Sequence, residues 1–147
     1  DLSSNGIVSV DPDVVIHRNL VDFLRTTMEP GKSLMVTEDP YMPLNVGVTF
    51  ALPSSFKWLR RWLSLNNVSE SREIFEEDQA VLNRMLARVA SLRSVLQIVP
   101  RSAIGQCGDR GSVATHYSCQ LDKVASMMRA SHWIAKDEQC RRANLVE

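Results

Sequence analysis

The chain has 147 residues, of which 44% are hydrophobic and 23% are charged, with 17 basic residues balanced by 17 acidic ones. This composition predicts one globular domain, residues 1–147, and excludes a disordered polar chain. Zero net charge excludes an overall field that draws the protein to nucleic acid. The apolar runs are also shorter than the roughly 20 residues of a membrane-spanning helix, so we expect a membrane anchor only outside this sequence.

Short apolar runs and periodic apolar stripes alternate along the chain. The runs predict strands, the stripes predict amphipathic helices, and Asn19 can cap the first helix. The alternation predicts an α/β fold with a mixed, mostly parallel sheet flanked by helices. We expect strands at 6–16, 34–36, 46–52 and 95–99, helices at 20–24, 53–63, 76–89 and 121–134, loops at 66–71 and 100–111, and a turn at 115–118.

Two carboxylates interrupt the first apolar run, in the sequence Asp11-Pro12-Asp13. The run resembles a strand covered on both faces, where a buried charge costs several kcal/mol unless it is paired or binds a cation. Side chains two residues apart on a strand share a face, and Pro12 cannot donate to a sheet ladder. Carboxylates at a strand end suit Mg²⁺ or Mn²⁺. A solvated turn is an equally good interpretation, because Asp and Pro are ordinary turn residues.

His116 and Lys123 are further candidates near the end of the chain. A lone histidine is more often packed or solvated than a ligand, but imidazole is a common metal ligand and the carboxylate pair still lacks ligands. Lys123 offers a point charge to a phosphate, although most such lysines are simply solvated. Convergence of His116 with Asp11 and Asp13 within a few Å would favour a metal site.

Two polar pairs and the cysteines leave several interpretations open. Asp78-Gln79 opens a predicted helix, where the helix dipole favours a carboxylate whatever the function. Asn45-Val46-Gly47 enters a strand, where glycine allows close approach of a ligand or marks a bulge. The three cysteines lack CxxC spacing, which leaves one disulfide and one free thiol as an open arrangement.

The order of these motifs resembles that of GT-A glycosyltransferases, which use nucleotide-sugar donors. The D-x-D motif matches Asp11–Asp13 and the N-x-G element matches Asn45–Gly47. The D-Q element at a helix start matches Asp78–Gln79, and the final H-x-x-x-C or H-x-x-G-x-x-K element matches the segment from His116 to Lys123. The resemblance is closest to the galactosyl/mannosyl/xylosyltransferase family, and it extends over residues 6–125.

The resemblance implies a hexosyl- or pentosyltransferase that moves a sugar from a nucleotide-sugar donor to a glycan or other acceptor, with retention of configuration. It implies Mn²⁺ or Mg²⁺ held by Asp11, Asp13 and His116. The implied catalytic residues are Asp78 and Gln79, and the implied substrate-binding residues are Asn45, Gly47 and Lys123.

The resemblance also implies that the chain corresponds to the C-terminal part of a catalytic domain and lacks the N-terminal nucleotide-binding half. The corresponding location is the Golgi lumen or another secretory compartment, as part of a type II membrane protein. The alternative interpretation is a non-catalytic relative that keeps the fold as a carbohydrate-binding or scaffolding module.

Overall fold

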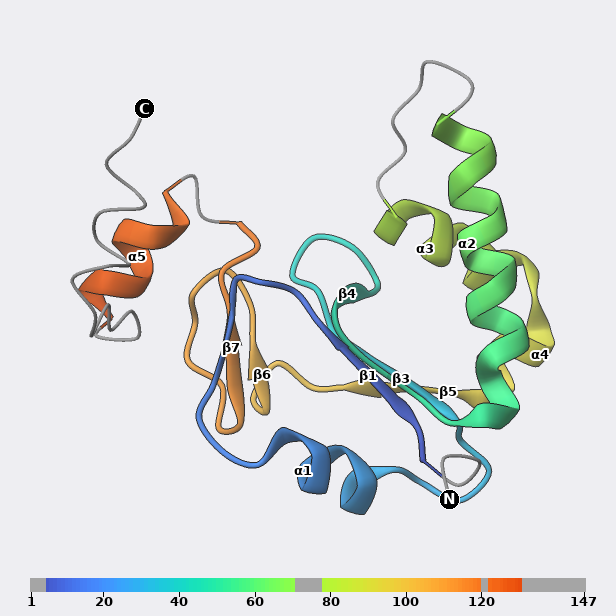
Figure 1. Ribbon diagram of the computed structural model, residues 1–147, viewed down its shortest axis with the longest axis horizontal. Coiled ribbons are helices and arrows are strands. Elements are labelled where there is room, and N and C mark those ends of the chain that lie inside the picture. Colours follow the sequence, from blue (N-terminus) through green and yellow to red (C-terminus); the bar gives the residue numbers. More distant parts are fainter. Residues whose placement is uncertain (1–4, 71–77, 120–121, 131–147) are drawn as a thin grey trace.

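The computed structural model describes residues 5–70, 78–119 and 122–130, which form two β-sheets and flanking helices (Figure 1). The strands are β1 (Ile7–Val10), β2 (Val14–Ile16), β3 (Leu34–Thr37), β4 (Asn45–Ala51), β5 (Leu96–Val99), β6 (Ile104–Gly105) and β7 (Ala114–His116). The helices are α1 (Leu20–Thr27), the 3-10 turn η1 (Pro53–Ser55), α2 (Phe56–Glu70), α3 (Asp78–Arg88), α4 (Ala90–Val95) and α5 (Lys123–Arg129). One sheet has the order β1-β4-β3-β5 and the other β2-β7-β6.

The four-stranded sheet carries a hydrophobic core on each face. β3 lies between β4 and β5, and all four of its residues are buried. Leu34 and Val36 pack with Leu82 of α3 on one face, whereas Met35 packs with Leu24 of α1 on the other. This alternation follows from the two-residue period of a strand. The sheet is therefore held between α1 on one side and α2, α3 and α4 on the other (Figure 1).

A tight turn joins the two sheets. β1 and β2 are consecutive in sequence but belong to different sheets, and Asp11-Pro12-Asp13 lies between them. The backbone N–H of Val14 donates to the carbonyl of Asp11 at 3.1 Å, which closes the turn. Pro12 is at the second position of this turn, where its fixed φ is favoured. The backbone N–H of Asp11 also donates to the carbonyl of Gly47 at 2.8 Å, which ties the turn to β4.

The predicted α/β architecture is confirmed, but the prediction of a mostly parallel sheet was wrong. Among the described residues, the pairs β1–β4, β3–β4 and β2–β7 are antiparallel, and the pairs β3–β5 and β6–β7 are parallel. A parallel connection needs a crossover of a dozen or more residues. The segment 38–44 between β3 and β4 is too short for one, so these neighbours run antiparallel.

Several local expectations also differ from the structure. The single strand expected at 6–16 is divided by the Asp11–Asp13 turn into β1 and β2, which belong to different sheets. The run was also expected to be buried on both faces, but Ile7 is 52% and Ile16 is 50% exposed because both strands lie at sheet edges within the described residues. The loop expected at 66–71 is helical to Glu70. Part of the turn expected at 115–118 belongs to strand β7, and strand β6 and helix α4 were not predicted.

The predicted ends of two helices, 76–77 and 131–134, lie outside the described residues. Over the described ranges, no helix combines the length and the apolar character needed to cross a membrane.

The core on the α1 side should depend strongly on Leu24, whose side chain is 1% exposed. We expect Leu24→Ala to lower the free energy of unfolding by about 2–5 kcal/mol, because it removes buried methyl groups and leaves a cavity. The matched control is Leu63→Ala at a residue that is 58% exposed, where a change within about 0.5 kcal/mol is expected. Urea unfolding followed by circular dichroism measures both, and equal effects would contradict this description of the core.

Candidate functional site

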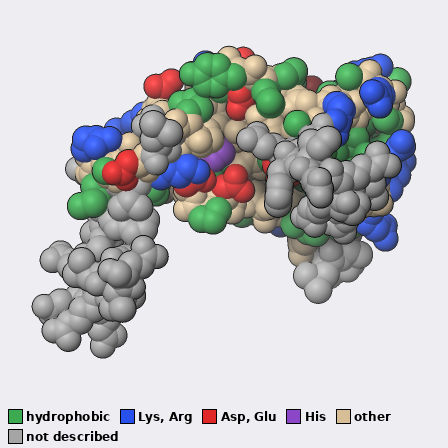
Figure 2. All heavy atoms as spheres, turned by 90° about the horizontal axis from the view of Figure 1, so that it is seen from above, with side chains coloured by type: hydrophobic (Ala, Val, Ile, Leu, Met, Phe, Trp, Pro, Cys, Tyr) green, Lys and Arg blue, Asp and Glu red, His purple; other side chains and the backbone are tan. Residues whose placement is uncertain are grey.

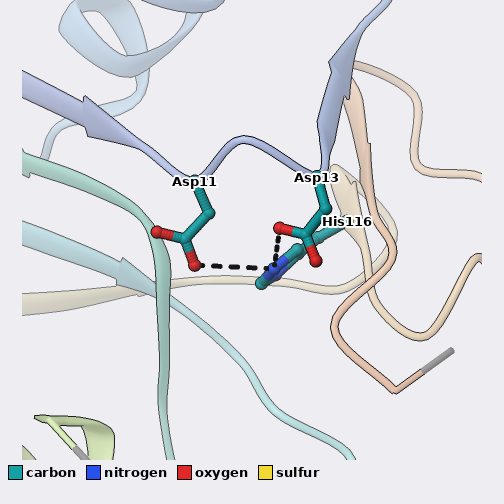
Figure 3. Close-up of side chains that lie close together, drawn as sticks. All are labelled: Asp11, Asp13 and His116. Carbon is teal, nitrogen blue, oxygen red and sulfur yellow. Dashed lines mark ion pairs between the residues drawn. The ribbon is translucent and has the colours of Figure 1, made fainter. Parts of the chain in front are cut away.

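Asp11, Asp13 and His116 converge where the two sheets meet. The imidazole Nε2 of His116 lies 3.2 Å from Oδ1 of Asp13 and 3.7 Å from Oδ2 of Asp11. One ligand atom from each of the three side chains lies within 4.8 Å of the other two. Figure 3 shows the two carboxylates on their turn, both directed toward the ring. This convergence was expected from the sequence, and the structure brings the three groups together.

The strand registers explain why these side chains meet. Val14 of β2 pairs with His116 of β7, so the ring lies next to the turn that carries both aspartates. The backbone N–H of Tyr117 donates to the carbonyl of Asp13 at 3.1 Å, which extends this pairing. Gly47 of β4 packs against the ring, and a Cβ atom there would lie 2.1 Å from Cε1 of His116. Glycine is therefore required at position 47 by the close approach of the imidazole.

Burial favours the neutral form of each of the three groups, and neighbouring charges oppose or reinforce this effect. Burial raises the pKa of Asp11 above its ordinary value, assisted by the charges of Asp13 and Asp78 and opposed by His116. Burial also favours the neutral form of Asp13, but Lys123 and His116 together lower its pKa, and the ammonium of Lys123 lies 2.6 Å from Oδ2. Burial lowers the pKa of His116 despite the two nearby carboxylates. The ring is therefore neutral near pH 7, with negative charge beside it.

A chain of buried polar groups extends behind His116. Nδ1 of the ring lies 3.0 Å from Oε1 of Gln106, and Nε2 of Gln106 donates to the hydroxyl of Thr37 at 3.1 Å. This hydroxyl donates to the backbone carbonyl of Asn45 at 3.1 Å. The amide oxygen of Asn45 accepts the backbone N–H of Gly47 at 2.8 Å, so the chain returns to the glycine beneath the ring. Gln106 and Thr37 were not predicted from the sequence, since a single amide and a single hydroxyl carry no motif.

Asp39 joins Asn45 to Gln79. Its Oδ2 accepts the side-chain amides of Asn45 at 3.2 Å and Gln79 at 3.4 Å, and its Oδ1 accepts the backbone N–H groups of Tyr41 and Met42. Asp39 was not predicted from the sequence, although an acidic residue directly before Pro40, just after a strand, is typical of a turn. Asn45 and Gln79 thus lie in one network, as neighbours of a common carboxylate.

Asp78 lies on a pocket that it shares with Asp11. The pocket has a volume of about 200 Å³. The backbone carbonyl of Asp78 accepts the indole N–H of Trp62 at 2.8 Å, which fixes the start of α3 against α2. Figure 2 shows acidic side chains next to an imidazole near the middle of the face seen from above. The pocket is lined by Ile7, Ser9, Asp11, Val46, Thr49, Ala51, Leu59, Trp62, Leu63 and Asp78.

A disulfide lies close to the chain of polar groups. Cys107 directly follows Gln106, and Cys119 is three residues after His116; the two are bonded, with Cα atoms 4.5 Å apart. The bond connects the segment after β6 to the segment between β7 and α5. The disulfide that the sequence left open is therefore found, while Cys140, the third cysteine, lies outside the described residues.

The three convergent groups fit a divalent cation. Ligands at about 2.0–2.6 Å from one ion are themselves roughly 3–5 Å apart, which matches the 4.8 Å limit found for Asp11, Asp13 and His116. Carboxylate oxygens are the ligands that Mg²⁺ and Mn²⁺ prefer, whereas imidazole is more typical of transition metals, so the mixed set favours Mn²⁺ over Mg²⁺. Two carboxylates beside a neutral ring also leave negative charge that a cation compensates.

The solved structures that share this fold include two glycosyltransferases, whereas no family model and no curated protein match the sequence. A glycosyltransferase involved in the glycosylation of the major capsid of PBCV-1 superposes with a TM-score of 0.61 at 15% identity, over 88% of this chain and 67% of that one. The glycosyltransferase GlyE of Streptococcus pneumoniae TIGR4 gives 0.57 at 15% identity, over 80% and 34%. The chain has a glycosyltransferase fold.

This glycosyltransferase fold agrees with the resemblance seen in the motif order. The chain spans about two thirds of the PBCV-1 protein and about a third of GlyE. The GT-A subtype, the galactosyl/mannosyl/xylosyltransferase family and the roles of individual residues stay predictions.

The packing of Gly47 against His116 yields a stability prediction. We expect Gly47→Ala to cost about 1–3 kcal/mol, because the new methyl group overlaps the imidazole. Urea unfolding measures the cost. In a His116→Ala background the same substitution should cost less than about 1 kcal/mol, since the ring is gone and the effects of contacting residues are not additive. Equal costs in both backgrounds would show that the ring does not occupy this space.

The ion pair between Lys123 and Asp13 yields a pH prediction. We expect Lys123→Met to raise the pKa of Asp13, because the ammonium favours the charged carboxylate. A carbon-13 NMR titration of the Asp13 carboxyl measures the shift. The matched control is Lys32→Met, because Lys32 donates to the backbone carbonyl of Ser94 rather than to a carboxylate.

The same ion pair predicts how stability depends on pH. The pKa of Asp13 is lower in the folded chain than its ordinary value of 3.8, so the ionised carboxylate stabilises the folded chain. This contribution to the free energy of unfolding is fully present above pH 3.8 and is lost as the pH falls through the pKa of the folded chain. The stability difference between Lys123→Met and the unaltered chain should therefore be present at pH 7 and shrink in acid. A difference that is constant with pH would contradict the ion pair.

Proposed function

We propose that the chain is the catalytic part of a metal-dependent glycosyltransferase, which moves a sugar from a nucleotide-sugar donor to a glycan or other acceptor. The observation that carries the proposal is the convergence of Asp11, Asp13 and His116 beside the pocket shared by Asp11 and Asp78. A cation held beside a pocket can stabilise the negative charge of a departing diphosphate, which is what the proposed transfer needs. The glycosyltransferase fold of the solved neighbours supports the same class of reaction.

The cluster defines the donor side of the proposed site. Asp11, Asp13 and His116 would hold Mn²⁺ or Mg²⁺. Such a cation, when bound, supplies the positive charge that stabilises a departing diphosphate. Lys123 would bind the same phosphates, because its ammonium already lies beside Asp13. The neutral state of His116 leaves a nitrogen lone pair for the cation, and burial of the ring excludes water from this side.

The polar network defines the sugar side of the proposed site. Asp78 and Gln79 would line the reaction centre as catalytic residues, where an exposed carboxylate and an amide accept and donate hydrogen bonds to sugar hydroxyls. Asp39 holds the amides of Gln79 and Asn45 in place, so these groups are oriented before a sugar binds. For Gly47 we propose an indirect share in substrate binding, through the position of the His116 ring.

The finer parts of the proposal follow from the motif resemblance. We propose a hexosyl- or pentosyltransferase of the GT-A type that retains the configuration of the transferred sugar. We assign no protein nucleophile. A secretory compartment such as the Golgi lumen is also proposed, with a membrane anchor outside this sequence. The Cys107–Cys119 disulfide supports an oxidising compartment, since disulfides persist there and are rare in the cytosol.

The metal site is tested by titrating Mn²⁺ into the full chain, with calorimetry or the electron paramagnetic resonance of free Mn²⁺ as the readout. We expect Asp13→Asn to weaken binding by at least about 100-fold, since changes to outer-shell partners alone typically cost 10–100-fold. The matched control is Asp22→Asn, because Asp22 is an exposed carboxylate in the first turn of α1. Binding that is unchanged in Asp13→Asn would reject the cluster as the metal site.

Transfer itself is tested with a panel of nucleotide sugars, by following Mn²⁺-dependent release of nucleoside diphosphate. We expect Asp78→Asn and Gln79→Ala to slow release while Mn²⁺ affinity stays within about threefold, because neither side chain belongs to the metal cluster. The anomeric configuration of the product, read by NMR, tests retention. Mn²⁺ and nucleotide binding without any release would favour the carbohydrate-binding or scaffolding module instead.

A further inference from the structure

We propose that Gln106 is a positioning residue that places the His116 proton on Nδ1 and so leaves the Nε2 lone pair directed at the two aspartates. The inference concerns which ring nitrogen carries the proton, and its consequence for metal binding rests on the proposed function. It adds to the site a residue that does not contact the cation.

Gln106 is built into the interior rather than into the surface. Its side chain is 0% exposed, and it contacts the ring nitrogen that faces away from the aspartates. The hydroxyl of Ser118 also lies near its Oε1, at 3.4 Å. A buried amide must satisfy its oxygen and its nitrogen separately, so the orientation of the amide is determined by its neighbours.

Thr37 determines that orientation. Its hydroxyl lies 3.1 Å from the backbone carbonyl of Asn45, which can only accept, so the hydroxyl hydrogen is committed to this bond. The other neighbour of the hydroxyl must then donate, which assigns Nε2 of Gln106 to the side of Thr37, at 3.1 Å. Oε1 of Gln106 consequently faces the ring. An amide oxygen can only accept, so Nδ1 of His116 carries the proton.

The assignment decides what the opposite nitrogen can do. With the proton on Nδ1, Nε2 presents a lone pair toward Asp13 at 3.2 Å and Asp11 at 3.7 Å, which is the arrangement of three ligands around a cation. With the proton on Nε2, the ring would instead donate to a carboxylate, and the cation would have to displace that proton. Metal-binding histidines commonly donate their second N–H to an oxygen acceptor, and Gln106 supplies that acceptor here.

The first experiment reads the tautomer directly, without any metal. Long-range proton–nitrogen NMR on the nitrogen-15-labelled full chain at pH 8.5, with EDTA present, distinguishes Nδ1–H from Nε2–H. We expect Nδ1–H at His116 in the unaltered chain and a shift toward Nε2–H in Gln106→Met, where the carboxylates are the acceptors left within reach of the ring. Nε2–H in the unaltered chain, or Nδ1–H unchanged in Gln106→Met, would overturn the proposal.

Two further variants separate positioning from general loss of structure. Gln106→Glu keeps an acceptor opposite Nδ1 and loses the donor to Thr37, so it should retain the Nδ1–H form. Gln97→Met is the matched control, because Gln97 is a half-buried amide on β5 that accepts from Glu29 and donates to the carbonyl of Thr27. It should leave the His116 tautomer unchanged. A purely structural role for Gln106 predicts equal loss of the Nδ1–H form in its Glu and Met variants.

The second experiment is Mn²⁺ affinity of the same four chains. We expect a loss of about 10–100-fold in Gln106→Met, as for other outer-shell partners, and changes within about threefold in Gln106→Glu and Gln97→Met. Equal affinities in Gln106→Met and the unaltered chain would overturn the link to the metal. If the tautomers are as expected but the unaltered chain binds no Mn²⁺, the proposed function fails while the effect of Gln106 on the proton stands.

Discussion

The approach of the His116 ring to two carboxylates is the constraint on which the arrangement of both sheets depends. The aspartates lie on the turn that transfers the chain from one sheet to the other, and the ring lies on a strand of the second sheet. Gly47 in the first sheet must lack a side chain for the ring to fit. A change in the register of β2 against β7 would move the ring away from the turn. The geometry of the cluster therefore depends directly on how these two strands pair.

A single hydrogen-bonded chain connects the cluster of Asp11, Asp13 and His116 to the start of α3. It extends from His116 through Gln106 and Thr37 to Asn45, and Asp39 continues it to Gln79. Buried polar groups are costly when unpaired, so each member restricts the orientation of the next. The imidazole and the Gln79 amide are thereby positioned by the same network, although they lie in β7 and α3.

The sequence predicted the elements with strong local patterns and missed those without them. Asn19 was correctly expected to cap α1, and its side chain accepts the backbone N–H of Asp22. β6 and β7 have two and three residues, too few for a two-residue period to show. Gln106 and Thr37 are 69 residues apart, so neither spacing nor periodicity could pair them. Spacing alone also left Asp11 and Asp13 divided between a turn and a metal site, and the motif order favoured the latter.

The structure shows that the turn and the convergence of carboxylates are not alternatives. Pro12 and the Val14–Asp11 hydrogen bond form the turn, and the same turn directs both aspartates toward the ring. The two carboxylates are not equivalent. Asp13 has Lys123 as a counter-charge, which lowers its pKa, whereas burial and neighbouring acidic groups raise the pKa of Asp11. The uncompensated negative charge therefore lies at Asp11, the member of the pair that also lines the pocket with Asp78. A cation bound between the two aspartates would neutralise this charge at the edge of the pocket, where the proposed donor diphosphate would need it.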